Sequence, residues 1–285
     1  MSQSPPAPPS LADLRREIDR IDQEVHNLLM ERAEIIDRLI AVKQTQEVGS
    51  AFRPAREADM MRRLVQRHHG ILPLTTVEGI WRVIIATFTY VQAPFAVHAD
   101  LSPGEPAMRD SARFHFGFVV PFVEHFSAQA AVEAAANSRG DLALVSATSS
   151  RTPWWAALED GAAPKIIARL PFVERADHPA AMPVFVISRV APDALVTEVE
   201  MWSVRVSGWN AGVARALASF AEIIAVPDRE SDGAALLISV PASEGFDKTR
   251  AALVQAGASV RSTALVGGHA TRYTVPADGG PSRTT

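Results

Sequence analysis

One apolar stripe in the first fifty residues constrains this chain more than any other feature. Its members recur at alternating intervals of four and three residues, which is the spacing along one face of an α-helix. They are Leu14, Ile18, Ile21, Val25, Leu28, Ile35, Leu39 and Val42. Ser10, followed three residues later by an acid, predicts an N-cap, and a glycine two residues after Glu47 predicts the end. A helix of that length, roughly 50 Å, must pack against equally long helices, and we expect a partner chain to supply them.

An arginine, Arg32, occupies one position of this stripe. Lys43 follows eleven residues later, about three helical turns, so both cations project from nearly the same side. A buried charge is costly unless it is paired or bound to a ligand. The two cations therefore indicate a pocket for an anion, with an ion pair of Arg32 to Glu57 or Glu31 as the alternative.

Two further helices are predicted before Pro94, over residues 53–69 and 75–92. The first has a proline, Pro54, in its first turn and is followed by Gly70, and the second begins with Thr75 and Glu78 in capping-box spacing. The first stripe is Glu57, Met61, Leu64, Val65 and His68; the second is Val77, Ile80, Trp81, Ile84, Ile85, Phe88 and Val91 or Gln92. Glu57 and Gln92 are thus polar members of apolar faces.

The pattern changes after Pro94 to short β-type runs that alternate with helical ones. From Glu198 the order is strand, helix, strand, strand, helix, strand, which is a ferredoxin-like βαββαβ unit. We therefore predict an α+β multidomain chain. Its parts are a disordered leader (1–9), a helical domain (10–94), a small α/β domain (95–195), the βαββαβ unit (196–277) and a disordered tail (278–285).

Composition excludes several classes of function. The chain has 285 residues, a net charge of −4 and no cysteine, so disulfides, thiolate nucleophiles and cysteine-bound zinc are excluded. No segment has the basic excess of a nucleic-acid-binding protein. No apolar run could span a bilayer, and the start, MSQSPPAPPS, lacks a signal-peptide core. We expect a cytoplasmic protein without nucleic-acid or membrane partners.

The three helices together resemble the all-helical chorismate mutases over about residues 10–93. The resemblance rests on LRREIDRIDQEVHNLLMERAEIIDRLIAVK, FRPAREADMMRRL and IWRVIIATFTYVQ. Within these, an arginine with a lysine eleven residues later, the P-x-R-E tetrapeptide and a closing glutamine form a specific combination. The resemblance implies an intertwined helical homodimer with antiparallel long helices, in which each active site takes residues from both chains.

The resemblance also implies the substrate, chorismate, and its rearrangement to prephenate in aromatic amino-acid biosynthesis, without a cofactor or metal. Arg15 lies 28 residues before Lys43, about 42 Å along the axis, so the two cannot meet within one helix. In an antiparallel dimer, however, Arg15 of the partner can reach the pocket that contains Lys43. The implied site residues are Arg15 from the partner, Arg32, Lys43, Arg56, Glu57 and Gln92.

Each implied residue has chemistry that suits this substrate. Arg15 and Arg32 would clamp the two carboxylates, because a planar guanidinium favours bidentate pairing. Lys43 and Gln92 would donate to the ether oxygen, which gains negative charge in the transition state. Glu57 would accept a hydrogen bond from the ring hydroxyl.

Arg56 would hold Glu57 or the substrate electrostatically. Two positions depart from the common family pattern: Arg53 replaces an acid, and Phe88 replaces a small hydroxyl residue. These departures support an alternative, a catalytically weak regulatory module that binds an aromatic amino acid or a shikimate-pathway enzyme. A helical dimerisation scaffold without catalytic function is a third interpretation.

The second half resembles a degenerate prephenate dehydratase followed by an ACT-type domain. Ser146, Thr148 and Ser149 replace that family's proline, glutamate and asparagine, and Pro183 and Val184 replace its threonine and arginine. Only about thirty residues separate these motifs, too few for a second lobe, so we predict no dehydratase activity. The ACT-type resemblance, at GWNAGVARAL, implies either an aromatic amino-acid effector site or a stabilising appendage.

Overall fold

The computed structural model describes residues 9–43, 51–148, 150, 152–189, 197–226 and 233–275. The chain divides into two compact units, residues 1–47 and 48–285. Apart from Pro9, the predicted leader lies outside the described residues, and so does the predicted tail. The predicted boundaries at 94/95 and 195/196 stay predictions.

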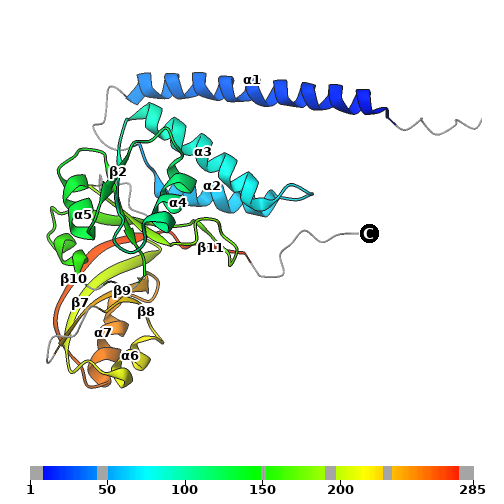
Figure 1. Cartoon of the computed structure of the whole chain (residues 1–285). Helices are drawn as coiled ribbons and strands as arrows, with labels where there is room; N and C mark the ends of the chain where they lie inside the picture. The colour runs from blue at the N-terminus through cyan, green and yellow to red at the C-terminus, as the bar shows by residue number, and fades with distance from the viewer. Residues whose placement is uncertain are drawn as a thin grey trace, which may run out of the picture. The chain divides into compact units, whose positions relative to one another are not determined.

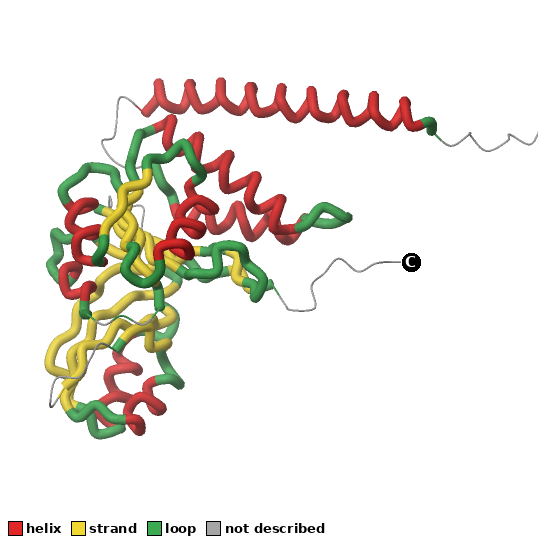
Figure 2. The backbone as a smooth tube through the Cα atoms, in the orientation of Figure 1, coloured by secondary structure: helices red, strands yellow, loops and turns green. Residues whose placement is uncertain are grey.

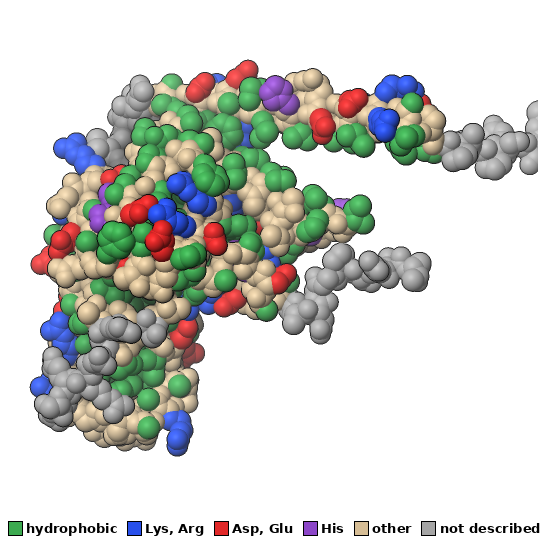
Figure 3. Space-filling view, viewed as in Figure 1, with side chains coloured by type: hydrophobic (Ala, Val, Ile, Leu, Met, Phe, Trp, Pro, Cys, Tyr) green, Lys and Arg blue, Asp and Glu red, His purple; other side chains and the backbone are tan. Residues whose placement is uncertain are grey.

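The first unit is one uninterrupted helix, α1 (Leu11–Lys43), of 33 residues (Figures 1 and 2). Its N-terminus is the predicted capping box: the amide of Ser10 donates to Asp13 Oδ2 at 3.0 Å, and the amide of Asp13 donates to Ser10 Oγ at 3.2 Å. The apolar residues of the stripe from Leu14 to Ile35 are all exposed, and Leu28 retains 63% of its accessible surface. Figure 3 shows hydrophobic atoms at the surface along this helix.

The second unit begins with a helical pair and a mixed sheet layer. Its first elements are α2 (Pro54–Arg67), α3 (Leu74–Gln92), β1 (Val97–Asp100), α4 (Glu105–Phe116), β2 (Phe122–His125), α5 (Ala128–Ala136), β3 (Leu142–Ser146), the 3₁₀ helix η1 (Trp154–Leu158), β4 (Lys165–Leu170), β5 (Val173–Glu174) and β6 (Val184–Ser188). Residues 152–183 add η1 and β4 to this layer, whereas β5 belongs to a separate two-stranded sheet.

The remaining elements have the predicted βαββαβ order. They are β7 (Val199–Ser207), α6 (Ala211–Leu217), β8 (Glu222–Ala225), β9 (Gly233–Pro241), α7 (Phe246–Gln255) and β10 (Ser259–His269), followed by β11 (Tyr273–Thr274), which pairs with β5. The strand order β10-β7-β9-β8 is antiparallel throughout, and α6 and α7 lie side by side on one face (Figure 1). The predicted ferredoxin-like unit is confirmed.

Among the described residues, both parts share one sheet in the order β2-β1-β3-β6-β4-β10-β7-β9-β8. The two parts meet where Gly267 of β10 pairs in parallel with Ile166 of β4. Gly267 has a φ of +139°, and a Cβ there would lie 2.1 Å from the carbonyl oxygen of Ile166. Only glycine allows this approach. The consecutive glycines Gly267 and Gly268 therefore belong to strand β10, and Gly267 lies where the two parts of the sheet join.

The sheet around β3 is covered on both faces. Leu142 and Leu144 pack with α2, α3 and α4, whereas Ala143 and Val145 pack with α5 and η1. This alternation is the two-residue period of a strand that is buried on both sides. The α2–α3 pair consequently shares its core with the α/β layer. Within the described residues, no helix has the length and apolarity needed to cross a bilayer.

The buried face of α3 differs from the predicted stripe. Its buried residues are Val77, Glu78, Arg82, Ile85, Ala86 and Thr89, while Ile80 and Val91 remain about half exposed, at 46% and 49%. The predicted face was chosen by apolarity alone. The observed face instead buries two charged residues, because each has an ionic partner on another element.

Candidate functional site

The three predicted site residues of α1 lie along one continuous helix. Arg15 is exposed, Arg32 is partly buried, and Lys43 is the last helical residue, whose side chain lies outside the description. Since α1 is unbroken, Arg15 and Lys43 are separated by about 42 Å along its axis, and positions 32 and 43, eleven residues apart, fall on nearly the same side of the helix. The helical geometry on which the sequence argument depended is therefore present.

The other three predicted residues lie on α2 and α3, which pack against each other. Arg56 is exposed in the first turn of α2, and Glu57 beside it is buried, with 4% of its surface accessible. Gln92 ends α3, is partly buried, and donates from Nε2 to the carbonyl oxygen of Phe88 at 2.9 Å. The structure thus places these three in one unit; their grouping with the residues of α1 stays a prediction.

Glu57 has a partner that the sequence analysis did not identify. Arg82 of α3 donates from Nη1 to Glu57 Oε2 at 2.8 Å, and the arginine retains only 1% of its accessible surface. Burial raises the pKa of the Glu57 carboxyl, and the Arg82 charge opposes this rise. The guanidinium therefore opposes protonation of the buried carboxyl and fixes the direction in which it points.

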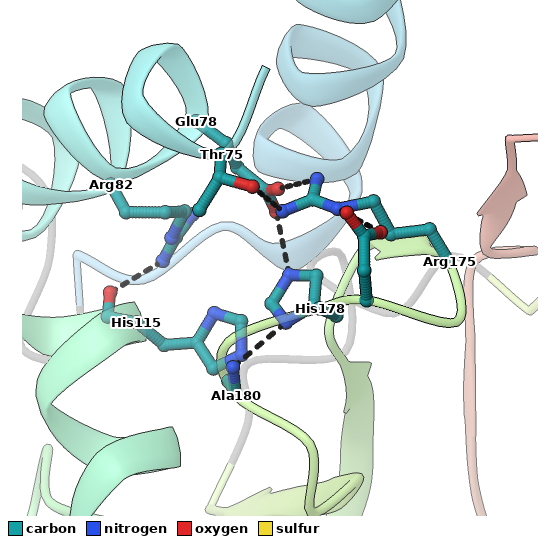
Figure 4. A network of polar contacts seen from close by, with 8 residues as sticks. Thr75, Glu78, Arg82, His115, Arg175, His178 and Ala180 are labelled. Carbon is teal, nitrogen blue, oxygen red and sulfur yellow. Dashed lines mark hydrogen bonds and ion pairs between the residues drawn. The ribbon is translucent and has the colours of Figure 1, made fainter. Parts of the chain in front are cut away.

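Arg82 belongs to a wider buried network (Figure 4). Its Nη2 donates to the backbone carbonyl of His115 on α4 at 2.9 Å. One turn earlier on α3, Glu78 accepts from Arg175 Nη1 at 2.7 Å and contacts Nε2 of His178 at 3.1 Å. The α2–α3 pair is therefore joined to α4 and to the segment after β5 by buried, charge-assisted hydrogen bonds.

The two histidines of the network have different surroundings. His178 Nδ1 accepts from the amide of Ala180 at 3.0 Å, which leaves its proton on Nε2 to donate to Glu78. Burial, and then the Arg82 charge, lower the pKa of His115 well below its usual range. Each of the two buried carboxyl groups is therefore paired with an arginine, Glu57 with Arg82 and Glu78 with Arg175.

The network was not predicted because Thr75 and Glu78 were interpreted as a cap at the N-terminus of α3. The sequence analysis assigned Thr75 and Glu78 to a capping box, but α3 begins at Leu74, after Pro73, without a side-chain cap. Thr75 Oγ1 instead accepts from Arg175 Nη2 at 2.8 Å. The signal was present in the sequence, because Glu78, Arg82 and Ile85 follow helical spacing with opposite charges four residues apart.

The positions where dehydratase motifs were predicted to be degenerate are partly described. The hydroxyls of Ser146 and Thr148 contact each other at 2.7 Å, while Ser149 lies outside the described residues. Over the described ranges, no cluster of three or more His, Asp or Glu side chains could hold a metal ion.

Comparison with known families assigns the N-terminal segment. Residues 14–93 match the family model described as chorismate mutase type II. This confirms the predicted resemblance over that segment, and all six predicted site residues fall within the match.

Three curated relatives carry the name bifunctional chorismate mutase/prephenate dehydratase. The protein from Neisseria gonorrhoeae is 32% identical over 103 residues, which are 36% of this chain and 27% of the relative. Those from Aquifex aeolicus and Pseudomonas aeruginosa are 30% and 32% identical, over 38% and 39% of this chain. The matches span less than a third of each relative, at most 31%.

Two solved structures are similar over a larger share of the chain. One is described as GqqA, a novel type of quorum quenching acylase, with 12% identity, a TM-score of 0.40 and coverage of 62% of this chain and 95% of that one. The other is a prephenate dehydratase from Streptococcus mutans, with 14% identity, a TM-score of 0.38 and coverage of 63% and 100%. Neither likeness is close enough to support an argument about activity.

Proposed function

We propose that this protein is a chorismate mutase, an isomerase that rearranges chorismate to prephenate in aromatic amino-acid biosynthesis. The observation that carries the proposal is the family match over residues 14–93, because it includes Arg15, Arg32, Lys43, Arg56, Glu57 and Gln92. The reaction is an intramolecular Claisen rearrangement, so the site needs only to bind a compact conformer of a dianion and stabilise developing charge.

The proposed roles follow the charges of the substrate. Arg15 of the partner and Arg32 bind the two carboxylates, while Lys43 and Gln92 donate to the ether oxygen as its bond to carbon stretches. Glu57 accepts from the ring hydroxyl, and its ionised state is supported by Arg82 on its other side. Arg56, exposed beside it, adds positive potential at the mouth of the site.

A homodimer that shares its active sites is part of this proposal. The stripe of α1 from Leu14 to Ile35 is exposed in the single chain, and a contiguous apolar surface of this kind is typical of an interface. Antiparallel pairing with a second copy would cover the stripe. The same pairing would bring Arg15 of one chain to Arg32 and Lys43 of the other.

An absorbance assay of chorismate loss by the purified chain tests the proposal. We expect turnover by the wild type and a loss of about 10²- to 10³-fold in kcat/KM for Arg32→Ala, as for other positioned charges. Circular dichroism and the dimer mass of the variant should equal those of the wild type. A folded wild-type dimer without turnover would favour the regulatory binding module instead.

The remaining expectations concern the second half and the location of the protein. We propose that residues 95–277 lack dehydratase activity, because residues 152–183 extend the sheet layer where a second lobe would be needed. An aromatic amino acid as effector of this region, and a cytoplasmic location, complete the proposal. Adding phenylalanine or tyrosine to the same assay tests the effector.

A further inference from the structure

A pocket of about 460 Å³ lies where the βαββαβ unit joins the α/β layer. Its walls come from β4, β5, the start of β7, β8, β9 and the end of β10, together with residues 218–221 and residues 271, 272 and 274. This volume is within the range of small-molecule sites. None of the lining residues comes from the turn at 208–210, which carries the ACT-type resemblance.

Two buried guanidinium groups line this pocket beneath exposed carboxylates. Arg169 pairs with Glu222 through two bonds of 2.7 and 3.0 Å, and its side chain is 8% exposed against 54% for the glutamate. Arg272 pairs with Glu174 at 2.9 Å, with exposures of 15% and 45%. In both pairs the cation is the more buried partner and the anion the more exposed one, and Glu222 also accepts from Ser239 Oγ at 3.3 Å.

The two arginines also influence each other. The pKa of Arg272 is lowered first by its burial and then by the charge of Arg169. Two partly desolvated cations at close range are stabilised by any anion placed between them. The rim glutamates supply one carboxylate each, from the solvent side.

His269 adds no charge to the pocket. Its Nδ1 proton is donated to the carbonyl oxygen of Ala270 at 2.8 Å, and burial lowers the pKa of the ring to about 4. The positive charges of the pocket therefore come from Arg169 and Arg272, each of which is paired with one glutamate at the rim. Next to it lies an apolar wall formed by Val199, Phe220 and Pro241.

We infer that this pocket is a binding site for a small molecule with a carboxylate on an apolar body. The ligand carboxylate takes the place of a rim glutamate on Arg272 or Arg169, and the apolar body covers Phe220 and Val199. Both a free carboxylate and the zwitterion of an amino acid have this shared chemistry. The inference concerns binding to residues 169–274 and does not depend on chorismate turnover.

Isothermal titration of the full chain with three probes tests the site. They are 3-phenylpropionate, which has only the carboxylate, L-phenylalanine, which has carboxylate and ammonium, and 2-phenylethylamine, which has only the ammonium. We expect 3-phenylpropionate to bind. Tighter binding of L-phenylalanine would identify a zwitterion as the ligand type, and equal or weaker binding would identify a simple carboxylate. Binding of the amine alone, or no heat from either carboxylate at millimolar concentration, would overturn the inference.

Two substitutions with opposite expected effects locate the binding. Arg272→Met removes a cation and should weaken the carboxylate probe at least 10-fold. Glu174→Gln removes the competing carboxylate, keeps the fold of the wall, and should strengthen the same probe several-fold. Arg205→Met is the matched control, because Arg205 is a partly exposed arginine of β7, paired with Glu159, that does not line the pocket. An equal loss in the control, or no gain with Glu174→Gln, would contradict the site.

Discussion

At the scale of single residues, Arg82 opposes the effect of burial on the pKa of Glu57. The two form a buried ion pair, and removing one partner of such a pair costs about 3–5 kcal/mol because the other charge is left uncompensated. The pKa of Glu57 is already raised above 4.5 by burial, against the opposing effect of Arg82. Without the arginine, the carboxyl should remain protonated in the folded state to a higher pH.

Arg82→Met should therefore be destabilising in a pH-dependent manner. A raised folded-state pKa means that the folded protein holds the proton of Glu57 more tightly than the unfolded chain does. The contribution of this carboxyl to the free energy of unfolding is therefore largest below its unfolded pKa, and it is lost as the pH rises through its folded pKa. Urea unfolding at about pH 5 and about pH 8 should show a larger deficit for Arg82→Met at the higher pH.

Two further variants make this measurement specific. Adding Glu57→Gln to Arg82→Met removes the buried charge and should abolish the extra pH dependence. Thr75→Val removes a neutral acceptor of Arg175 in the same network and leaves no buried carboxyl without its arginine, so it controls for general loosening of the interface. If Thr75→Val reproduced the pH dependence, or Arg82→Met showed none, the role assigned to Arg82 would be wrong.

At the scale of elements, the seam between β4 and β10 depends on a single glycine. Gly267→Ala would place a methyl group against the backbone of Ile166 at a φ of +139°. We expect a loss of stability of about 1–3 kcal/mol from overpacking, in addition to the backbone strain. Gly245→Ala, at a φ of +70° with no atom within 4 Å of the added methyl, carries the strain alone.

Thermal unfolding of both variants separates these contributions. Gly267→Ala should lower Tm clearly more than Gly245→Ala, and it should also weaken the carboxylate site, since Arg169 and His269 lie on the two strands of the seam. Equal shifts in Tm would mean that the seam tolerates a side chain and that the glycine is not required there.

Elements were predicted from the sequence more reliably than their faces. Periodicity identified α1, α2, α3 and the βαββαβ order, because each depends on local spacing. The buried face of α3 was predicted only in part: Val77 and Ile85 are buried as predicted, but Glu78 and Arg82 were left out. Their partners, Arg175 after β5 and Glu57 on α2, lie elsewhere in the chain. The shared sheet was also missed, since the pairing of Gly267 with Ile166 joins residues a hundred positions apart.

In the candidate site, too, features that depend on local spacing were predicted, whereas contacts between elements were not. Arg32 and Lys43 could be placed on one side of a helix from their spacing alone, and α1 has that geometry. That Arg82 pairs with Glu57 could not be derived in this way, because the contact depends on how α3 is rotated against α2. Helical period fixes which residues share a face; tertiary packing decides what that face meets.

At the scale of the whole molecule, the proposed active site requires two chains. Arg15 and Lys43 are about 42 Å apart on one straight helix, so a site that contains both must take them from different copies. Closed twofold symmetry then gives two equivalent sites per dimer. This arrangement has a consequence for mixtures of inactive variants that a site within one chain does not have.

Arg15→Ala and Lys43→Ala should each be nearly inactive alone but should complement each other when mixed. In a heterodimer of the two, one site combines the intact Lys43 of the first chain with the intact Arg15 of the second, and the other site lacks both. Random reassortment makes about half of the dimers heterodimers, so about a quarter of wild-type activity should return. Chorismate consumption after co-refolding of equal amounts measures this recovery.

A mixture of Arg32→Ala with Lys43→Ala is the matched control. Both residues come from the same chain in the proposed site, so each site of that heterodimer lacks one of them and no intact site can form. Recovery in the first mixture without recovery in the second would establish which residue crosses the dimer. Recovery in neither mixture, from folded dimers whose wild type is active, would contradict a site that takes Arg15 and Lys43 from different chains.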